Sequence, residues 1–428
     1  MSNFMQSNDS SNNNDSDSIT STSVSNNDDS DSTILTSASK TMKMTSSQIV
    51  MAESVQAEEV PTIPLGSLQT VSEFHPDISV HSVAPKDSVM LPVPLVEQPP
   101  QNKRSLGERL TILWEGIRPG YLPLSLLPII LGSVAAWTQS ISPKTPRGEF
   151  HPIRFVIILI AVLLLQIGTN LVNDYYDYLN GIDFSNSLGP GGLIQQGLVK
   201  PARVLSYGLA ALVLGALLGA YVAISGSWLL VVFGLLGLFA AYFYSGPRRG
   251  LSSRALGELI SFCIFGPLLT LGAYMVQTGY LDRLVFIYSI SLGLLATAFI
   301  HINNMRDAES DAQAGKDTLA SILGFRLSRT LYLIVVLGAY APIVALALPR
   351  HAPHLLLLVL WTLPGLVIAV TGAVRAYSPA SLNIVMQQTL KIEVLFTLLL
   401  IVALVVTAMF PILLDLLLPH LPVLNLPF

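Results

Sequence analysis

Acidic side chains gather at two places in the chain, and each cluster directly follows a long apolar run. In the first, TNLVNDYYDYLNGIDF, Asp174 and Asp177 lie three residues apart and Asn173 adds a neutral oxygen donor. In the second, HINNMRDAESDAQAGKDTLA, Asp307 and Asp311 lie four residues apart. On a helix, both spacings place the two carboxylates on one face. Each cluster can therefore present two carboxylates to one cation.

The ligands in these clusters predict a magnesium diphosphate site. Two facing pairs of carboxylates repel each other unless positive charge lies between them. Mg²⁺ typically binds one or two carboxylates together with substrate phosphates, and Arg and Lys side chains contact phosphate oxygens directly. The predicted metal ligands are Asn173, Asp174, Asp177, Asp183, Asp307 and Asp311, and the predicted diphosphate ligands are Arg118, Arg248, Arg306 and Lys316.

A simpler interpretation exists for each aspartate taken alone, because single Asp residues at helix ends are often caps or solvated loop residues. Asp183 and Asp317 are the residues to which this interpretation applies most readily, because each could be a loop charge. The pattern occurs twice, however, and acidic residues at the edge of a membrane are costly. The repetition therefore favours function.

The elements that position these residues are membrane helices. Of the 428 residues, 51% are hydrophobic and only 12% are charged, whereas soluble domains carry about 25% charged residues. Spans of about 20 apolar residues predict an all-α integral membrane protein with nine transmembrane helices. The expected spans are 121–140, 154–174, 204–224, 227–245, 257–277, 284–303, 330–349, 354–374 and 394–417.

Lys and Arg residues near the span ends predict the orientation. Fifteen of them fall on the side that holds the N-terminus and the loops after even-numbered spans, against five on the other side. The N-terminus and both acidic clusters are therefore expected in the cytoplasm. Residues 1–105, rich in Ser, Asn and Asp, are expected to form a disordered cytoplasmic tail, and residues 106–428 to form the membrane domain.

The two clusters resemble the Asp-rich motifs of the UbiA superfamily of intramembrane prenyltransferases. The resemblance covers roughly residues 110–420 and implies nine helices around a central cavity, with the motifs on the second and sixth helices. NDYYDYLNGID has Gly181 where members that act on 4-hydroxybenzoate tend to carry the last Asp, and the acid follows at Asp183. This spacing, GPGGLIQQGL (189–198) and NNMRDAESDAQAGKDTLA (303–320) look like the branch that acts on 1,4-dihydroxy-2-naphthoate.

That branch resemblance implies Mg²⁺-dependent transfer of a polyprenyl group from polyprenyl diphosphate to dihydroxynaphthoate, with decarboxylation, in menaquinone biosynthesis. A bacterial plasma membrane is the implied location. Residues expected near the acceptor or the prenyl cation are Tyr175, Tyr244, Gln196 and Asn304. The tyrosines also suit interfacial anchors. His301 precedes the second cluster by about one turn, and is either the general base or a packed helix histidine.

Other functions remain as alternatives. A UbiA-type enzyme can use another acceptor, such as homogentisate, 4-hydroxybenzoate, a chlorophyllide, haem or a glycerol lipid. An ion-coupled transporter would place its carboxylates near the bilayer midplane, whereas these lie at span ends. The net charge of −4 indicates no nucleic-acid partner, and the single Cys263 excludes an intrachain disulfide.

Overall fold

The computed structural model describes residues 105–142, 149–181, 192–224, 226–246, 250–348 and 353–417. In these ranges the regular structure is helical, and the nearest approach to a strand is a single bridge between Arg254 and Asp317. The predicted all-α class is therefore confirmed. Residues 1–104 of the predicted tail, together with Asp183 and Arg248, lie outside the described residues.

Nine helical segments match the predicted number of spans. Eight stretches of the described chain are long and apolar enough to cross a membrane, and α5 is a shorter apolar helix. The elements are α1 Leu106–Ile117, η1 Pro119–Tyr121, α2 Leu122–Ser140, α3 Pro152–Leu179, α4 Pro201–Ile224, α5 Trp228–Phe243, η3 Leu251–Ser253, α6 Gly257–Cys263, η4 Ile264–Leu268, α7 Leu269–Thr278, α8 Arg283–Gln313, α9 Leu319–Gly338, α10 Ala341–Ala347, η5 His354–Thr362, α11 Leu363–Arg375 and α12 Pro379–Leu417.

Several spans extend beyond the predicted bounds because polar residues continue the helices. Helix α12 begins at Pro379, fifteen residues before the apolar run that predicted it. Helix α8 continues past its apolar part to Gln313, and α3 continues to Leu179. Both acidic clusters therefore lie on the last turns of helices. Hydropathy marks only the part of a helix in lipid, so it misses these polar ends.

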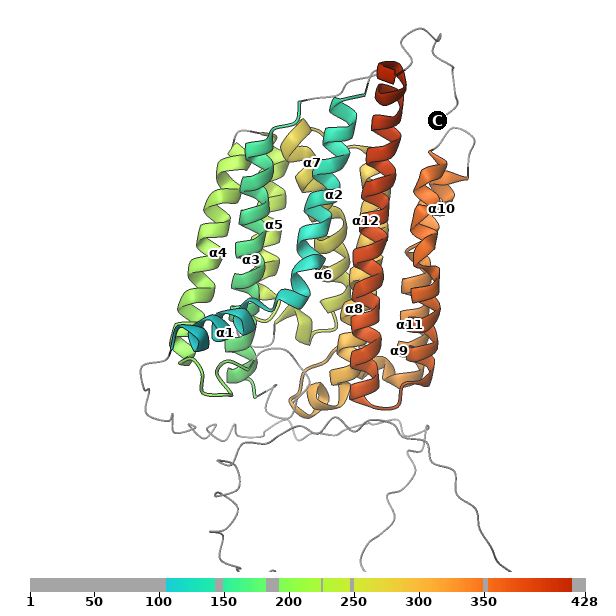
Figure 1. Cartoon of the computed structure of the whole chain (residues 1–428). Coiled ribbons are helices and arrows are strands. Elements are labelled where there is room, and N and C mark those ends of the chain that lie inside the picture. The colour runs from blue at the N-terminus through green and yellow to red at the C-terminus, as the bar shows by residue number, and fades with distance from the viewer. Residues whose placement is uncertain are drawn as a thin grey trace, which may run out of the picture. The chain divides into compact units, whose positions relative to one another are not determined.

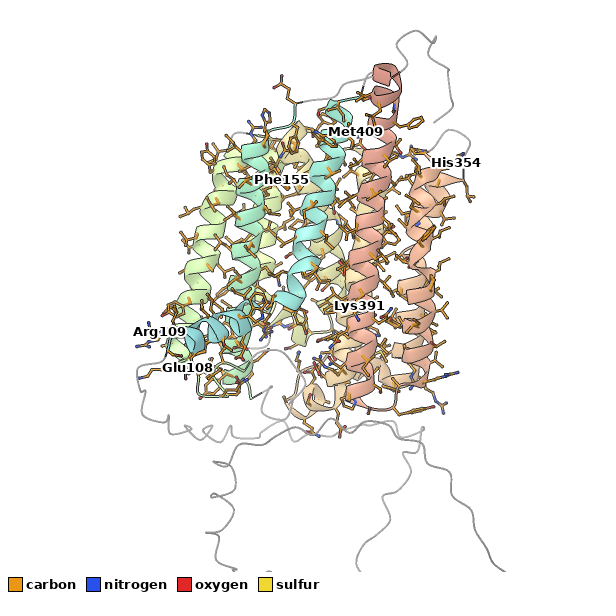
Figure 2. The ribbon with its side chains drawn as sticks, viewed as in Figure 1. Glu108, Arg109, Phe155, His354, Lys391 and Met409 are labelled. Carbon is orange, nitrogen blue, oxygen red and sulfur yellow. The ribbon has the colours of Figure 1, made fainter. Side chains whose placement is uncertain are left out.

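Helix α1 differs from the others in direction, since it lies across the lower ends of helices that stand side by side (Figure 1). It begins with a capping box between Ser105 and Glu108, in which each side chain accepts a hydrogen bond from the backbone N–H of the other residue. Leu110 and Trp114, one turn apart, are more than half exposed. Figure 2 shows Glu108 and Arg109 directed away from the helix bundle. This apolar face suits a helix lying at the membrane surface.

Helix α8 is the most enclosed span of the described chain. Leu295, Phe299 and Ile302 on α8 are almost fully buried, in one cluster with apolar residues of α9, α10 and α12. Such packing holds the axis of α8 in a fixed place. The second acidic cluster is therefore carried by a rigid element.

The span formed by α6, η4 and α7 contains a wide turn. Residues Ile264–Leu268 form a π-helical turn, and Pro267 lies inside it. Proline lacks the N–H of a regular helical bond, and π turns often occur at functional sites. Ile264, Phe265 and Leu268 from this turn line the large cavity described below.

Close helix packing predicts a strong effect of a methyl group at Gly132. A Cβ at this position would lie 2.1 Å from the carbonyl oxygen of Thr270 on α7. We expect Gly132→Ala to destabilise the protein by about 1–3 kcal/mol, the usual cost of overpacking. Thermal unfolding in detergent would measure this. Gly219→Ala on α4, where nothing lies within 4 Å, is the control and should not lower the unfolding temperature.

Candidate active site

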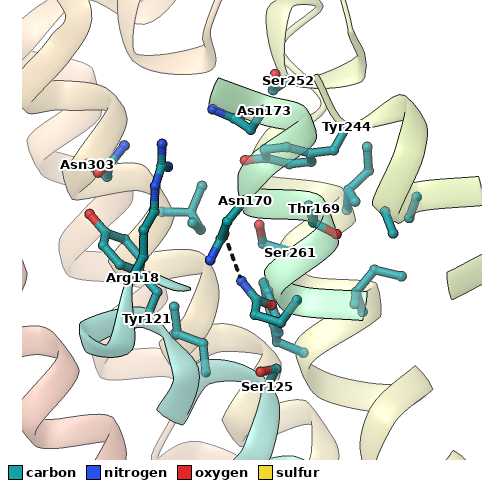
Figure 3. A pocket seen from close by; sticks show the side chains of 18 of the residues that line it. Arg118, Tyr121, Ser125, Thr169, Asn170, Asn173, Tyr244, Ser252, Ser261 and Asn303 are labelled. Atoms are coloured by element: carbon teal, nitrogen blue, oxygen red, sulfur yellow. Dashed lines mark hydrogen bonds between the residues drawn. The ribbon is translucent and has the colours of Figure 1, made fainter. Parts of the chain in front are cut away.

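A cavity opens between α2, α3, α5, α6, η4 and α8, and it brings the two acidic clusters to one place. Asp177 on α3 and Asp307 and Asp311 on α8 all line it. Figure 3 shows Arg118, Tyr121 and Asn303 on one side, opposite Asn173, Tyr244 and Ser252. Other parts of the wall are apolar, formed by residues such as Leu165 and Phe265. The cavity thus combines a charged region with space suited to hydrocarbon.

In the first cluster the side chains of Asn173 and Asp177 are held together. Asn173 donates to Asp177 Oδ2 and accepts a hydrogen bond from the hydroxyl of Ser245, which follows α5. These contacts fix Asn173 and Asp177 one helical turn apart on the cavity side of α3. The oxygen of Asp177 and the amide of Asn173 therefore form one half of a potential cation site.

Asp174 has a different environment, although it belongs to the same motif. Its Oδ1 accepts hydrogen bonds from Arg118 Nη2 at 2.7 Å and from the backbone N–H of Gly192 at 3.1 Å. Its Oδ2 accepts from the N–H of Leu193 at 3.2 Å. The side chain is only 2% exposed and does not line the cavity. Asp174 therefore joins α1 and the 192–198 loop to α3.

Arg118 carries backbone strain at this junction. It ends α1 with φ 53° and ψ 61°, the left-handed conformation that costs a non-glycine residue roughly 1–2 kcal/mol. The strained turn directs α1 into Pro119 and places the Arg118 side chain in the cavity wall. Strain of this kind is often retained where a side chain must be positioned for function.

In the second cluster each aspartate is paired with a cation. Arg306 donates two hydrogen bonds to Asp307, at 2.7 and 2.6 Å, and a third to Asn303 Oδ1 at 3.1 Å. Lys316 Nζ lies 3.3 Å from Asp311 Oδ1. A guanidinium in this bidentate geometry fixes the carboxylate orientation. Helix α8 and the loop that follows it therefore present two pairs of opposite charges to the cavity.

Lys316 is held at the cavity by the loop between α8 and α9. Its N–H donates to Asp311 O at 2.8 Å, and the next residue, Asp317, accepts at its carbonyl from Ala255 N at 2.8 Å. Burial alone would lower the pKa of the Lys316 ammonium, but the carboxylates of Asp311 and Asp177 outweigh it and raise that pKa above its ordinary value. Lys316 is therefore a fixed positive charge near both clusters.

The structure separates the predicted site residues into three sets. The residues that line the cavity are Arg118, Asn173, Asp177, Tyr244, Asn304, Arg306, Asp307, Asp311 and Lys316. Asp174, Tyr175 and Gln196 are described but do not line it. Tyr175 instead packs with Leu193 and Ile194 of the loop. Asp183 and Arg248 lie outside the described residues, so their roles stay predictions.

His301 is packed inside the protein and not exposed to the cavity. It is fully buried, and its two ring nitrogens lie 2.9 Å from Glu258 Oε1 and 3.0 Å from the carbonyl oxygen of Ser328. This matches the packed helix histidine, the second of the two predicted alternatives. Glu258 did not figure among the predicted residues, although a lone acid inside the apolar span 257–277 is a signal for function.

Comparison with known proteins gives the family. The model of the UbiA prenyltransferase family matches residues 125–393, which is more than half of the chain and includes both acidic clusters. The chain belongs to the UbiA prenyltransferase family. The family predicted from the two motifs is thereby confirmed.

Named relatives within the UbiA family agree with the predicted branch. The chain is 32% identical to 1,4-dihydroxy-2-naphthoate octaprenyltransferase of Bacillus subtilis, over 71% of this chain and 94% of the relative. The enzyme of the same name from Haemophilus influenzae is 34% identical, over 55% and 77%. UbiA prenyltransferase domain-containing protein 1 of Danio rerio is 35% identical, over 52% and 65%. The resemblance to the naphthoate branch is confirmed at the level of sequence.

Proposed function

We propose that this UbiA-family protein transfers a polyprenyl group from polyprenyl diphosphate to 1,4-dihydroxy-2-naphthoate, with loss of the ring carboxylate as CO₂ and release of diphosphate. The product is demethylmenaquinol, the hydroquinone form of demethylmenaquinone. One observation carries the proposal: Asp177, Asp307, Asp311 and Lys316 share one cavity, and part of its wall is apolar. A charged region suits the diphosphate, and the apolar walls suit the hydrocarbon. The names of the similar enzymes support dihydroxynaphthoate as the acceptor.

The donor set fits Mg²⁺. Hard cations take oxygen ligands, and Mg²⁺ usually binds through one or two carboxylates plus substrate phosphates and waters, without an all-protein cage. Asn173, Asp177, Asp307 and Asp311 supply such oxygens from two helices. Within the described ranges, no group of three or more His, Cys, Asp or Glu side chains is placed to hold a metal ion by itself, so phosphate oxygens of the substrate would have to complete the coordination. Bound Mg²⁺ would neutralise charge on the departing diphosphate.

The cationic side chains of the chain bind and orient the diphosphate. Lys316 acts as a partly buried point charge, and Arg118, whose Nη2 donates to Asp174, offers its remaining guanidinium N–H groups to the diphosphate. Breaking the allylic C–O bond leaves a carbocation on the prenyl carbon, and the electron-rich ring attacks it to form the new C–C bond. The ring of Tyr244, which lines the cavity, can stabilise this cation.

The protein is an integral membrane protein, and we propose that its active site opens toward the cytoplasm of a bacterial cell. The excess of Lys and Arg on the side of the N-terminus supports this orientation. Both clusters lie at the ends of spans on that side, where a water-soluble acceptor has access.

Product formation by membranes that contain the protein tests the function. The membranes are incubated with Mg²⁺, a radiolabelled polyprenyl diphosphate and a panel of acceptors that includes dihydroxynaphthoate, homogentisate and 4-hydroxybenzoate. We expect a labelled lipid product with dihydroxynaphthoate only, and none when EDTA replaces Mg²⁺. Product with homogentisate and none with dihydroxynaphthoate would show that the proposed acceptor is wrong.

A further inference from the structure

A chain of buried hydrogen bonds lies directly behind the cavity wall and connects three helices. Glu258 on α6 is 5% exposed, and its Oε1 lies 2.9 Å from His301 Nδ1 and accepts from Asn304 Nδ2 at 3.0 Å. His301 Nε2 lies 3.0 Å from the carbonyl oxygen of Ser328 on α9. Of these residues, Asn304 lines the cavity. The chain therefore ends at the substrate space.

The proton positions follow from what each partner can do. A backbone carbonyl only accepts hydrogen bonds, so His301 Nε2 carries a proton. One further proton lies between His301 Nδ1 and Glu258 Oε1, on either atom. In both arrangements Oε1 offers a lone pair to Asn304. The amide nitrogen of Asn304 must then face Glu258, because the opposite orientation would set two acceptor oxygens against each other.

This orientation leaves Asn304 Oδ1 as the atom that the amide can offer to a ligand. The backbone of Gly257 lies beside the same wall, since a Cβ there would be 3.5 Å from the Tyr244 hydroxyl and 3.7 Å from Asn304 Nδ2. Tyr244 and Ser261 also line this part of the cavity (Figure 3). The wall thus presents a fixed hydrogen-bond acceptor near the phenol group of Tyr244.

We propose that Asn304 Oδ1 accepts a hydrogen bond from a ring hydroxyl of the aromatic acceptor, and that Glu258 and His301 are positioning residues that fix the Asn304 amide. The inference rests on the proposed function, since it assigns the acceptor subsite of that reaction. A phenolic hydroxyl is a donor that matches a fixed carbonyl oxygen, and its ring can lie against Tyr244. Sites built to bind a hydroxyl discriminate strongly against analogues that lack it.

The test compares acceptors that differ by one hydroxyl group. Purified full-length protein is assayed at saturating prenyl diphosphate with dihydroxynaphthoate and with two analogues, each lacking one ring hydroxyl. We expect Asn304→Leu to lower kcat/KM for dihydroxynaphthoate about ten- to hundredfold, the loss expected for one buried hydrogen bond. For the analogue that lacks the hydroxyl bound by Asn304, kcat/KM should be the same in wild type and in Asn304→Leu. The KM for prenyl diphosphate should not change.

Glu258→Gln tests the positioning role while keeping the shape of the side chain. A glutamine at position 258 can present its NH₂ group to Asn304 and so reverse the orientation of the Asn304 amide. We therefore expect kcat/KM for dihydroxynaphthoate to fall, but by less than in Asn304→Leu. Gln388→Leu removes an amide that donates to the Gly365 carbonyl between α12 and α11, outside the cavity, and should match wild type. Thermal unfolding of each variant separates misfolding from altered selectivity.

The outcomes distinguish the two proposals. If wild type converts dihydroxynaphthoate but Asn304→Leu lowers kcat/KM by the same factor for all three acceptors, the proposed hydroxyl contact is wrong and the proposed function stands. If Glu258→Gln lowers only the unfolding temperature, the positioning role is wrong. If wild type converts no dihydroxynaphthoate, the proposed function fails and this inference fails with it.

Discussion

Asp177→Asn is expected to lower kcat by about a hundred- to thousandfold, the usual loss when one preorganised contact to developing charge is removed. The side chain keeps its shape and its place beside Asn173, but the negative charge that attracts Mg²⁺ is gone. The Mg²⁺ concentration for half-maximal rate should rise at the same time. Initial rates over a Mg²⁺ titration, at fixed acceptor concentration, measure both effects. Asp311→Asn should behave in the same way.

Asp282→Asn is the matched control for Asp311→Asn, because it makes the same change at the other end of α8. Asp282 caps the helix by accepting from the N–H groups of Leu284 and Val285, and asparagine caps helices equally well. This variant should retain wild-type rates and Mg²⁺ dependence. Near-normal activity of both Asp177→Asn and Asp311→Asn would instead exclude the two-cluster metal site.

The sequence predicted the parts of this fold that depend on hydropathy and helical periodicity. In the described part of the chain, eight spans are long apolar runs and α5 is a shorter one, and α4 ends at Ile224 and α5 begins at Trp228, on either side of the predicted break. The sequence also predicted that the two clusters lie together, because both follow even-numbered spans and therefore end on the same side of the membrane. Asp177 and Asp311 do line one cavity.

Tertiary contacts decided what could not be predicted. Helical spacing puts Asp174 and Asp177 on roughly one face of α3, but residues three apart still differ by about 60° around the helix axis. This difference is enough for Asp174 to face Arg118 and the 192–198 loop. The left-handed conformation of Arg118 could not be predicted, because position 118 carries neither glycine nor asparagine, the residues that usually adopt it. Glu258 was visible as a lone acid in an apolar span, but its partner His301 lies 43 residues away.

Asp174→Asn is expected to act through Arg118 and the 192–198 loop, with a smaller effect on the metal than Asp177→Asn. The carboxylate accepts three hydrogen bonds, and an amide would turn an NH₂ group toward some of these donors. Breaking a buried pair by removing one partner typically costs about 3–5 kcal/mol. We therefore expect a lower unfolding temperature without Mg²⁺ and a higher KM for prenyl diphosphate.

The Mg²⁺ titration separates this role from metal ligation. If Asp174 holds Arg118 and the loop, the Mg²⁺ concentration for half-maximal rate stays near wild type in Asp174→Asn while it rises in Asp177→Asn. An equal rise in both variants would show that Asp174 is a metal ligand as well. The double variant Arg118→Met/Asp174→Asn removes both charges, and removal of both partners is far less costly than removal of one. It should recover much of the lost thermal stability but not the affinity for the diphosphate, because the guanidinium that binds it is gone.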